Sequence, residues 1–90
     1  MHIDWDQAAA RTALRLQRMI RFATTNPPGN EKRLAEGLAA EVREAGLPAE
    51  VVEPAPGRGS LAVRLPGRGA ARPLLLLSHL DVVPAEPSAW

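Results

Sequence analysis

The sequence contains no cysteine, and its only aromatic residues are Trp5, Phe22 and Trp90. The lack of cysteine excludes disulfide bonds and thiolate zinc sites, and it removes any inference about the cellular compartment from disulfides. Because large aromatic side chains are so few, the core of the protein must be built mainly from Leu, Val and Ala.

Long apolar runs and a strong excess of charge are also missing. No segment approaches the ~20 apolar residues of a membrane span, and the acidic stretch from Met1 to Asp6 lacks the apolar region of a secretory signal peptide. The formal net charge of +1 argues against a dedicated nucleic-acid surface, which carries clustered positive charge. We therefore expect a cytoplasmic protein that binds neither membrane nor nucleic acid.

The apolar spacing of the first 23 residues predicts an amphipathic helix. It begins near Asp4 or Asp6, because either carboxylate can accept hydrogen bonds from the free N–H groups of the first turn. The apolar stripe comprises Ala9, Ala13, Leu16, Ile20 and Ala23. Arginines occupy another face, at positions 11, 15, 18 and 21. This arginine row is either a solvated helix face or a surface for an anionic partner.

A second helix is predicted after a loop from Thr24 to Asn30. Pro27 and Pro28 end the first helix, and Asn30 is a suitable N-cap for the second. Its apolar stripe comprises Leu34, Leu38, Val42 and Ala45, and the run Gly46-Leu47-Pro48 predicts its end. The loop either sets the angle between the helices or forms a wall of a substrate site.

The residues after the second helix predict a β-hairpin. Its strands run from Ala49 to Glu53 and from Ser60 to Leu65, with a turn from Pro54 to Gly59. Arg58 and Arg68 stand beside glycines, but neither loop has the spacing of a phosphate-binding motif. Both loops are therefore interpreted as turns.

The candidate chemistry lies in the segment from Leu74 to Pro84. Four leucines behind Pro73 predict a strand buried on both faces. Residues two apart on a strand point to the same side, so His79 and Asp81 would project together from its end, where ligand sites of open α/β sheets lie. A carboxylate beside an imidazole is the arrangement that a metal-binding histidine needs. The alternatives are a core or capping histidine and a turn-forming or capping aspartate.

Two stretches of the sequence resemble the M20 metallopeptidase family. Residues 78–84, Ser-His-Leu-Asp-Val-Val-Pro, are similar to its His-x-Asp-Val-Val-Pro signature, and residues 24–31, Thr-Thr-Asn-Pro-Pro-Gly-Asn-Glu, are similar to the segment that joins its first two helices. Residues 53–59 and 65–67 also fit the family's hairpin. The family includes carboxypeptidases, aminoacylases and other deacylases.

The resemblance implies a fold and a role for each candidate residue. The fold would be α/β: two N-terminal helices, a hairpin and a buried strand of a mixed sheet flanked by helices. His79 would ligate one of two clustered metal ions, usually zinc, with cobalt or manganese as alternatives. Asp81 would be the catalytic-site aspartate that accepts a hydrogen bond from the other ring nitrogen of His79.

The resemblance also implies residues that the sequence does not contain. A bridging aspartate, a glutamate base, further carboxylate ligands and a second histidine have no matching motif in residues 1–90. We therefore expect these residues to be the N-terminal part of a catalytic domain that cleaves small peptides or N-acyl amino acids, inactive on their own. Some relatives dimerise through a second domain, which would lie outside this chain. The alternatives are a non-catalytic helix–hairpin interaction module and a degenerate family member that has lost its metal.

Overall fold

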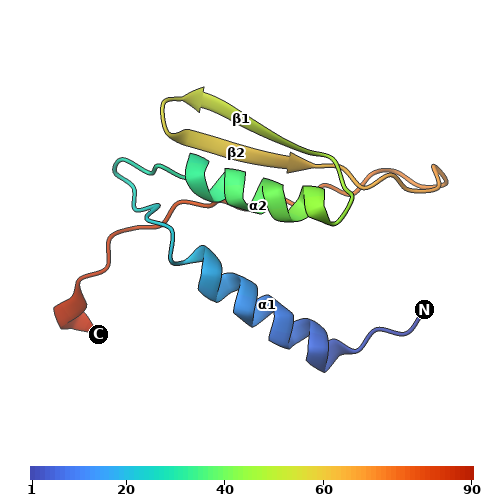
Figure 1. Ribbon diagram of the computed structural model, residues 1–90, viewed down its shortest axis with the longest axis horizontal. Helices are drawn as coiled ribbons and strands as arrows, with labels where there is room; N and C mark the ends of the chain where they lie inside the picture. Colours follow the sequence, from blue (N-terminus) through green and yellow to red (C-terminus); the bar gives the residue numbers. More distant parts are fainter.

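Helix α2 (Lys32–Glu44) lies against an antiparallel hairpin formed by β1 (Ala49–Ala55) and β2 (Arg58–Val63). The computed structural model describes residues 1–90, and Figure 1 shows α2 and the hairpin as two adjacent layers. Helix α1 (Trp5–Met19) precedes them in the chain. The protein is thus a small α+β domain with two α-helices and a two-stranded sheet. A short 3₁₀ helix, η1 (Pro87–Ala89), follows near the C-terminus.

The core lies between α2 and the hairpin and is small. Its buried apolar residues are Leu34, Ala35 and Ala39, all on one face of α2. The hairpin approaches the start of the helix closely, since a Cβ atom added to Gly59 would lie 2.5 Å from Cα of Lys32. Only glycine permits this contact, so Gly59 sets how near β2 lies to α2.

The end of α2 agrees with the sequence prediction and its start does not. Gly46 has φ 83°, its N–H donates to the carbonyl of Arg43, and the N–H of Leu47 donates to the carbonyl of Val42. This is a Schellman motif, as the Gly-Leu-Pro run indicated. The predicted N-cap Asn30 is wrong: it has φ 55°, outside the extended conformation of N-caps. Glu31 occupies the cap position, without a side-chain cap bond.

The hairpin is confirmed, with a shorter turn than predicted. Strand β1 continues to Ala55 and β2 begins at Arg58, with an irregularity in the register between Val52 and Ala55. Gly57, with φ 75°, forms the turn, and its carbonyl accepts a hydrogen bond of 3.0 Å from the N–H of Lys32. The turn is thereby attached to the first residue of α2.

Helix α1 stands apart from this layered pair (Figure 1). Asp4 caps it by accepting a hydrogen bond of 3.0 Å from the N–H of Gln7, as predicted. None of its residues is buried, and the predicted apolar stripe is open, with Ile20 68% exposed. Part of the arginine row holds the helix to α2, because Arg18 donates a hydrogen bond of 2.9 Å to Glu41.

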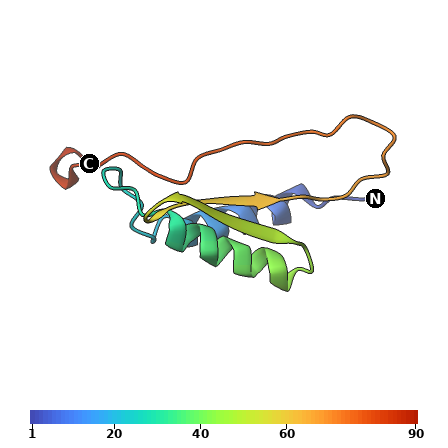
Figure 2. The same cartoon turned by 90° about the horizontal axis from the view of Figure 1, so that it is seen from above.

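The segment from Leu74 to Leu77 differs from the prediction of a buried strand. Its four leucines are between 81% and 89% exposed, and the segment belongs to no strand. Figure 2 shows it as an extended chain that runs back along the length of the molecule. A strand needs a neighbour, and the only sheet here is the two-stranded hairpin. The mixed sheet expected from the sequence is therefore not formed by these residues.

None of the helices has the length and apolar character that crossing a membrane requires.

Candidate functional site

The carboxylate of Asp81 is the centre of a polar cluster built from four separate segments. Its side chain is 25% exposed. The side-chain amide of Asn26, from the loop after α1, donates a hydrogen bond of 2.9 Å to Oδ2 of Asp81. The guanidinium of Arg58, at the start of β2, lies 3.6 Å from the same oxygen. The other carboxylate oxygen, Oδ1, contacts His79.

His79 uses one ring nitrogen in the cluster and leaves the other open. Nδ1 lies 2.8 Å from the backbone carbonyl oxygen of Asp81 and 3.1 Å from its Oδ1. A carbonyl oxygen can only accept, so Nδ1 must carry the hydrogen in this geometry. The neutral imidazole then has its lone pair on Nε2, which has no partner in the structure, and the side chain is 83% exposed. Such a nitrogen can bind a metal ion or accept a proton.

Arg58 is itself held by an acidic residue at the start of α2. Its Nε lies 2.8 Å and 2.9 Å from the two carboxylate oxygens of Glu31. The side chain of Glu31 is only 10% exposed, so this ion pair is shielded from water more than an ordinary surface pair. The cluster therefore continues from Asp81 through Arg58 to the body of α2.

Backbone pairing brings the loop after α1 beside the His79 segment. Val82 donates its N–H to the carbonyl of Thr24 at 3.1 Å, and Asn26 donates its N–H to the carbonyl of Val82 at 2.8 Å. These bonds form an isolated parallel bridge between Thr25 and Val82. The two stretches that carried the strongest family resemblance thus lie side by side.

The surroundings of Asp81 favour its ionised form. The hydrogen bond from Asn26 lowers the pKa of Asp81 from its ordinary value of 3.8; desolvation opposes the shift, and the hydrogen bond with His79 adds to it. Asp81 is accordingly a carboxylate at neutral pH, as an acceptor for an imidazole N–H should be.

A hollow of about 520 Å³ opens beside the cluster. His79, Asp81 and Arg58 contribute to its wall, with Leu61 and Leu76 among its apolar lining. The hollow therefore combines polar groups with apolar surface beside the His79–Asp81 pair.

Sequence reasoning found two members of the cluster and missed the others. The period of two placed His79 beside Asp81, and the structure does bring them together. Asn26 was part of a loop for which a site wall was one of two interpretations, and its contact with Asp81 favours that one. Arg58 was interpreted as a turn residue, and no role in the site was predicted for Glu31. Glu31 lies in residues 24–31 and Arg58 in residues 53–59, and both stretches resemble segments of the family, but neither resemblance indicated a contact with Asp81.

The residues of the cluster provide only one ligand for a metal ion, His79. Structural and catalytic zinc sites use at least three protein ligands, and no group of three or more His, Cys, Asp or Glu side chains in the structure could hold a metal ion. His79 supplies one suitable nitrogen, already supported by a carboxylate on its other side.

No protein-family model, curated protein or solved structure matches the chain. The interpretation of the cluster therefore depends on its residues and their geometry.

Proposed function

We propose that residues 1–90 form the first part of the catalytic domain of an M20-like, metal-dependent amidohydrolase. Its substrates would be small peptides or N-acyl amino acids, and His79 would be its first metal ligand. One observation carries the proposal: Nδ1 of His79 is engaged by Asp81 while Nε2 is open. Metal-binding histidines nearly always have this arrangement.

Each residue of the cluster has a defined task in this proposal. Nε2 of His79 would bind the metal, and zinc ions in such a site supply an activated water and a polarised amide carbonyl. Asp81 holds the Nδ1–H tautomer and the orientation of the ring, and its charge makes the imidazole a better ligand. Asn26 keeps Asp81 in place through its hydrogen bond of 2.9 Å.

The exposed leucines support the larger domain in the proposal. Leu74 to Leu77 are extended, adjacent and more than 80% exposed, and contiguous apolar surface of this kind usually contacts further protein. Strands and helices outside residues 1–90 would cover them and supply the remaining ligands and the general base. The 90 residues alone would then be catalytically inert.

The test uses the protein as its natural source produces it. We expect an intact mass well above 9.7 kDa, bound metal, and metal-dependent hydrolysis of N-acyl amino acids or dipeptides. His79→Ala should abolish tight metal binding, and Asp81→Ala should weaken metal affinity or activity roughly 10- to 100-fold. His2→Ala is the matched control and should change neither. Unchanged metal content and rate in the His79 and Asp81 variants would exclude the proposal.

A second function is favoured by a different exposed surface: a non-catalytic module that binds a partner protein. The open apolar stripe of α1, with Leu16 56% exposed, favours it. The two functions differ in how residues 1–90 behave alone. A self-contained module should unfold cooperatively and stay monodisperse, whereas part of a larger domain should self-associate through the leucine segment. Sedimentation and urea unfolding of the purified chain separate these outcomes.

A further inference from the structure

We propose that Arg58 is a positioning residue for the His79–Asp81 pair, acting from the hairpin through the carboxylate of Asp81. As far as it concerns metal binding, this role rests on the proposed function. Its structural part does not: together with the backbone carbonyl of Asp81, which lies 2.8 Å from Nδ1, Arg58 would favour the form of His79 in which Nδ1 carries the hydrogen, whether or not metal is present.

The first step of the argument is that the guanidinium has a fixed orientation. Nε of Arg58 contacts both oxygens of Glu31, at 2.8 Å and 2.9 Å. The guanidinium is planar and rigid, so holding one edge also sets the direction of the terminal nitrogens. One of these, Nη2, lies 3.6 Å from Oδ2 of Asp81.

The second step is that the two oxygens of Asp81 have different partners. Oδ2 faces the amide of Asn26 at 2.9 Å and the guanidinium of Arg58 at 3.6 Å. Oδ1 faces Nδ1 of His79 at 3.1 Å, beside the backbone carbonyl of Asp81, which lies 2.8 Å from the same nitrogen. Rotation of the carboxylate would exchange these environments and move Oδ1 away from the ring. The hydrogen bond from Asn26 and the positive charge of Arg58, both on the side of Oδ2, therefore favour the orientation that keeps Oδ1 available to the imidazole.

The third step is that the packing of the hairpin on α2 positions Arg58 beside Asp81. Gly57 accepts a hydrogen bond from the N–H of Lys32, and Gly59 lies against the backbone of the same residue. Arg58 stands between these two contacts, so its backbone position is fixed on both sides. Tautomer selection at His79 is thereby coupled to the α2–hairpin contact.

The experiment measures the tautomer of His79 by long-range ¹H–¹⁵N NMR of the 90-residue chain at a pH where the ring is neutral. All variants carry His2→Ala, so that His79 is the only imidazole. The substitutions are Arg58→Ala, Arg58→Gln and Arg58→Lys, with Arg68→Ala as the control because Arg68 is an exposed arginine in a loop, without an ion pair. Backbone chemical shifts of β1 and β2 report whether each variant keeps the hairpin. The same samples are then titrated with Zn²⁺ alone.

The parent chain should show predominantly the Nδ1–H form. Arg58→Ala and Arg58→Gln should lower the ratio of Nδ1–H to Nε2–H several-fold and weaken zinc binding by up to about 10-fold, the lower end of the effect of losing a supporting carboxylate. Arg58→Lys should fall between, because it keeps the charge without the fixed fork. Arg68→Ala should match the parent chain.

The outcomes separate this inference from the proposed function. An unchanged tautomer ratio in any folded Arg58→Ala or Arg58→Gln variant overturns the positioning role. If both of these lose the hairpin, the ratio in Arg58→Lys decides, since a parent-like ratio there overturns the role equally. A parent chain in which Zn²⁺ shifts Nδ1 of His79 in place of Nε2 counts against the proposed function, while a ratio that still depends on Arg58 supports the positioning role.

Discussion

The side-chain amide of Asn26 donates a hydrogen bond of 2.9 Å to Oδ2 of Asp81, across 55 positions of the sequence. The backbone of the same asparagine donates to the carbonyl of Val82 at 2.8 Å. One residue of the loop after α1 therefore holds the His79 segment by both its main chain and its side chain. This relationship joins the two stretches of the sequence that were most suggestive of a catalytic site.

The Asn26→Ala substitution should loosen the segment around Val82. The backbone bonds to Thr24 and Asn26 remain available, but the side-chain tether is lost, so local opening becomes more frequent. We expect faster amide hydrogen exchange at Val82 and no change in exchange within α2. Asn30→Gly is the matched control, because it lies in the same loop and keeps the positive φ of 55° accessible. Equal exchange at Val82 in the parent chain and in Asn26→Ala would show that the tether is not needed.

Two leucine-to-alanine substitutions should differ sharply in their effect on stability. Leu34 is 3% exposed within the small core, and removing it should lower the free energy of unfolding by about 2–5 kcal/mol. Leu75 is 81% exposed, and removing it should change that free energy by no more than about 0.5 kcal/mol. Urea unfolding measures both. A large loss with Leu75→Ala would mean that the leucine segment is packed in solution.

The same leucine segment should promote self-association. Four adjacent exposed leucines form a contiguous apolar strip, which is a site for contact with other molecules. Sedimentation velocity at increasing concentration should show association that Leu75→Lys reduces. Leu65→Lys, on an isolated leucine that is 72% exposed, is the control and should reduce it less. Equal effects of the two lysines would assign the association to net charge.

Gly59→Ala should destabilise the protein by about 1–3 kcal/mol, the usual effect of overpacking. Its added methyl group would lie 2.5 Å from Cα of Lys32, which is backbone and cannot move aside. Gly67→Ala is the control: nothing lies within 4 Å of its added methyl group, and the change should stay within about 0.5 kcal/mol. Thermal unfolding of the two variants measures the difference, and equal midpoints would contradict the close approach.

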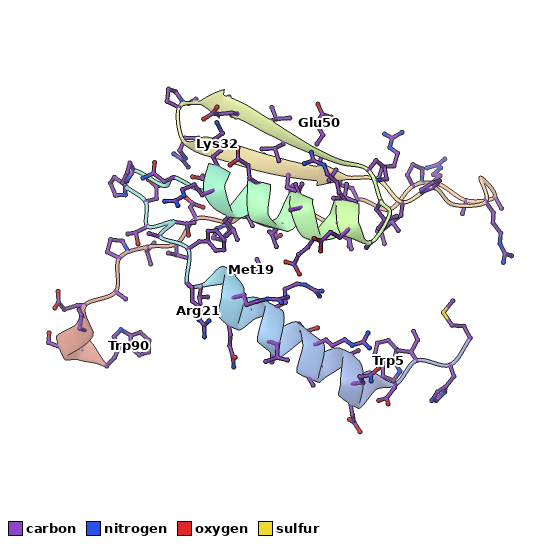
Figure 3. The ribbon with its side chains drawn as sticks, viewed as in Figure 1. Trp5, Met19, Arg21, Lys32, Glu50 and Trp90 are labelled. Atoms are coloured by element: carbon purple, nitrogen blue, oxygen red, sulfur yellow. The ribbon has the colours of Figure 1, made fainter.

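The ion pair between Lys32 and Glu53 should make stability depend on pH at both extremes. Figure 3 shows Lys32 at the start of α2, on the side of the hairpin, and its Nζ lies 3.0 Å from Oε1 of Glu53. A hydrogen bond from the N–H of Gly57, then one from Lys32, lowers the pKa of Glu53 from 4.5. The hydrogen bond to Glu53 raises the pKa of Lys32 from 10.5.

The sign of each effect follows from these directions. Glu53 contributes stability above pH 4.5 that is lost as the pH falls through its folded-state pKa, and Lys32 contributes stability below pH 10.5 that is lost as the pH rises through its own. Urea unfolding of Glu53→Gln should show a deficit relative to the parent chain at neutral pH that shrinks in acid. Glu50→Gln, on the same strand without an ion pair, should show no such trend. A constant deficit down to pH 2 would contradict the account.

Local chemistry in the sequence was sufficient for the regular elements. Asp4 caps α1 through a contact three residues away, and Gly46 ends α2 through bonds to residues within one turn. The hairpin follows from alternation and a Gly turn. Asn30 was misjudged: its φ is 55°, and its side chain lies at the approach of Gly57 from the hairpin, where an added Cβ atom would be 2.7 Å from Oδ1 of Asn30. That approach is tertiary and has no local signal.

The leucine segment and the site also show that local features could be predicted from the sequence and tertiary contacts could not. An apolar run indicates burial only if other elements cover it, and in this structure nothing pairs with Leu74 to Leu77. The pairing of His79 with Asp81 is local and was predicted. The contacts of Asp81 with Asn26 and Arg58 join segments distant in sequence, so spacing within the strand contains no information about them.

The most direct test of the central claim is to identify which nitrogen of His79 meets a metal ion. A Zn²⁺ titration of the ¹⁵N-labelled chain in the His2→Ala background, followed by long-range ¹H–¹⁵N NMR, resolves the two ring nitrogens. We predict that the Nε2 resonance shifts with added Zn²⁺ while Nδ1 keeps its hydrogen, and that Asp81→Ala weakens the response. A response at Nδ1 in place of Nε2, or a response that Asp81→Ala leaves unchanged, would contradict the assignment of His79 as a metal ligand supported by Asp81.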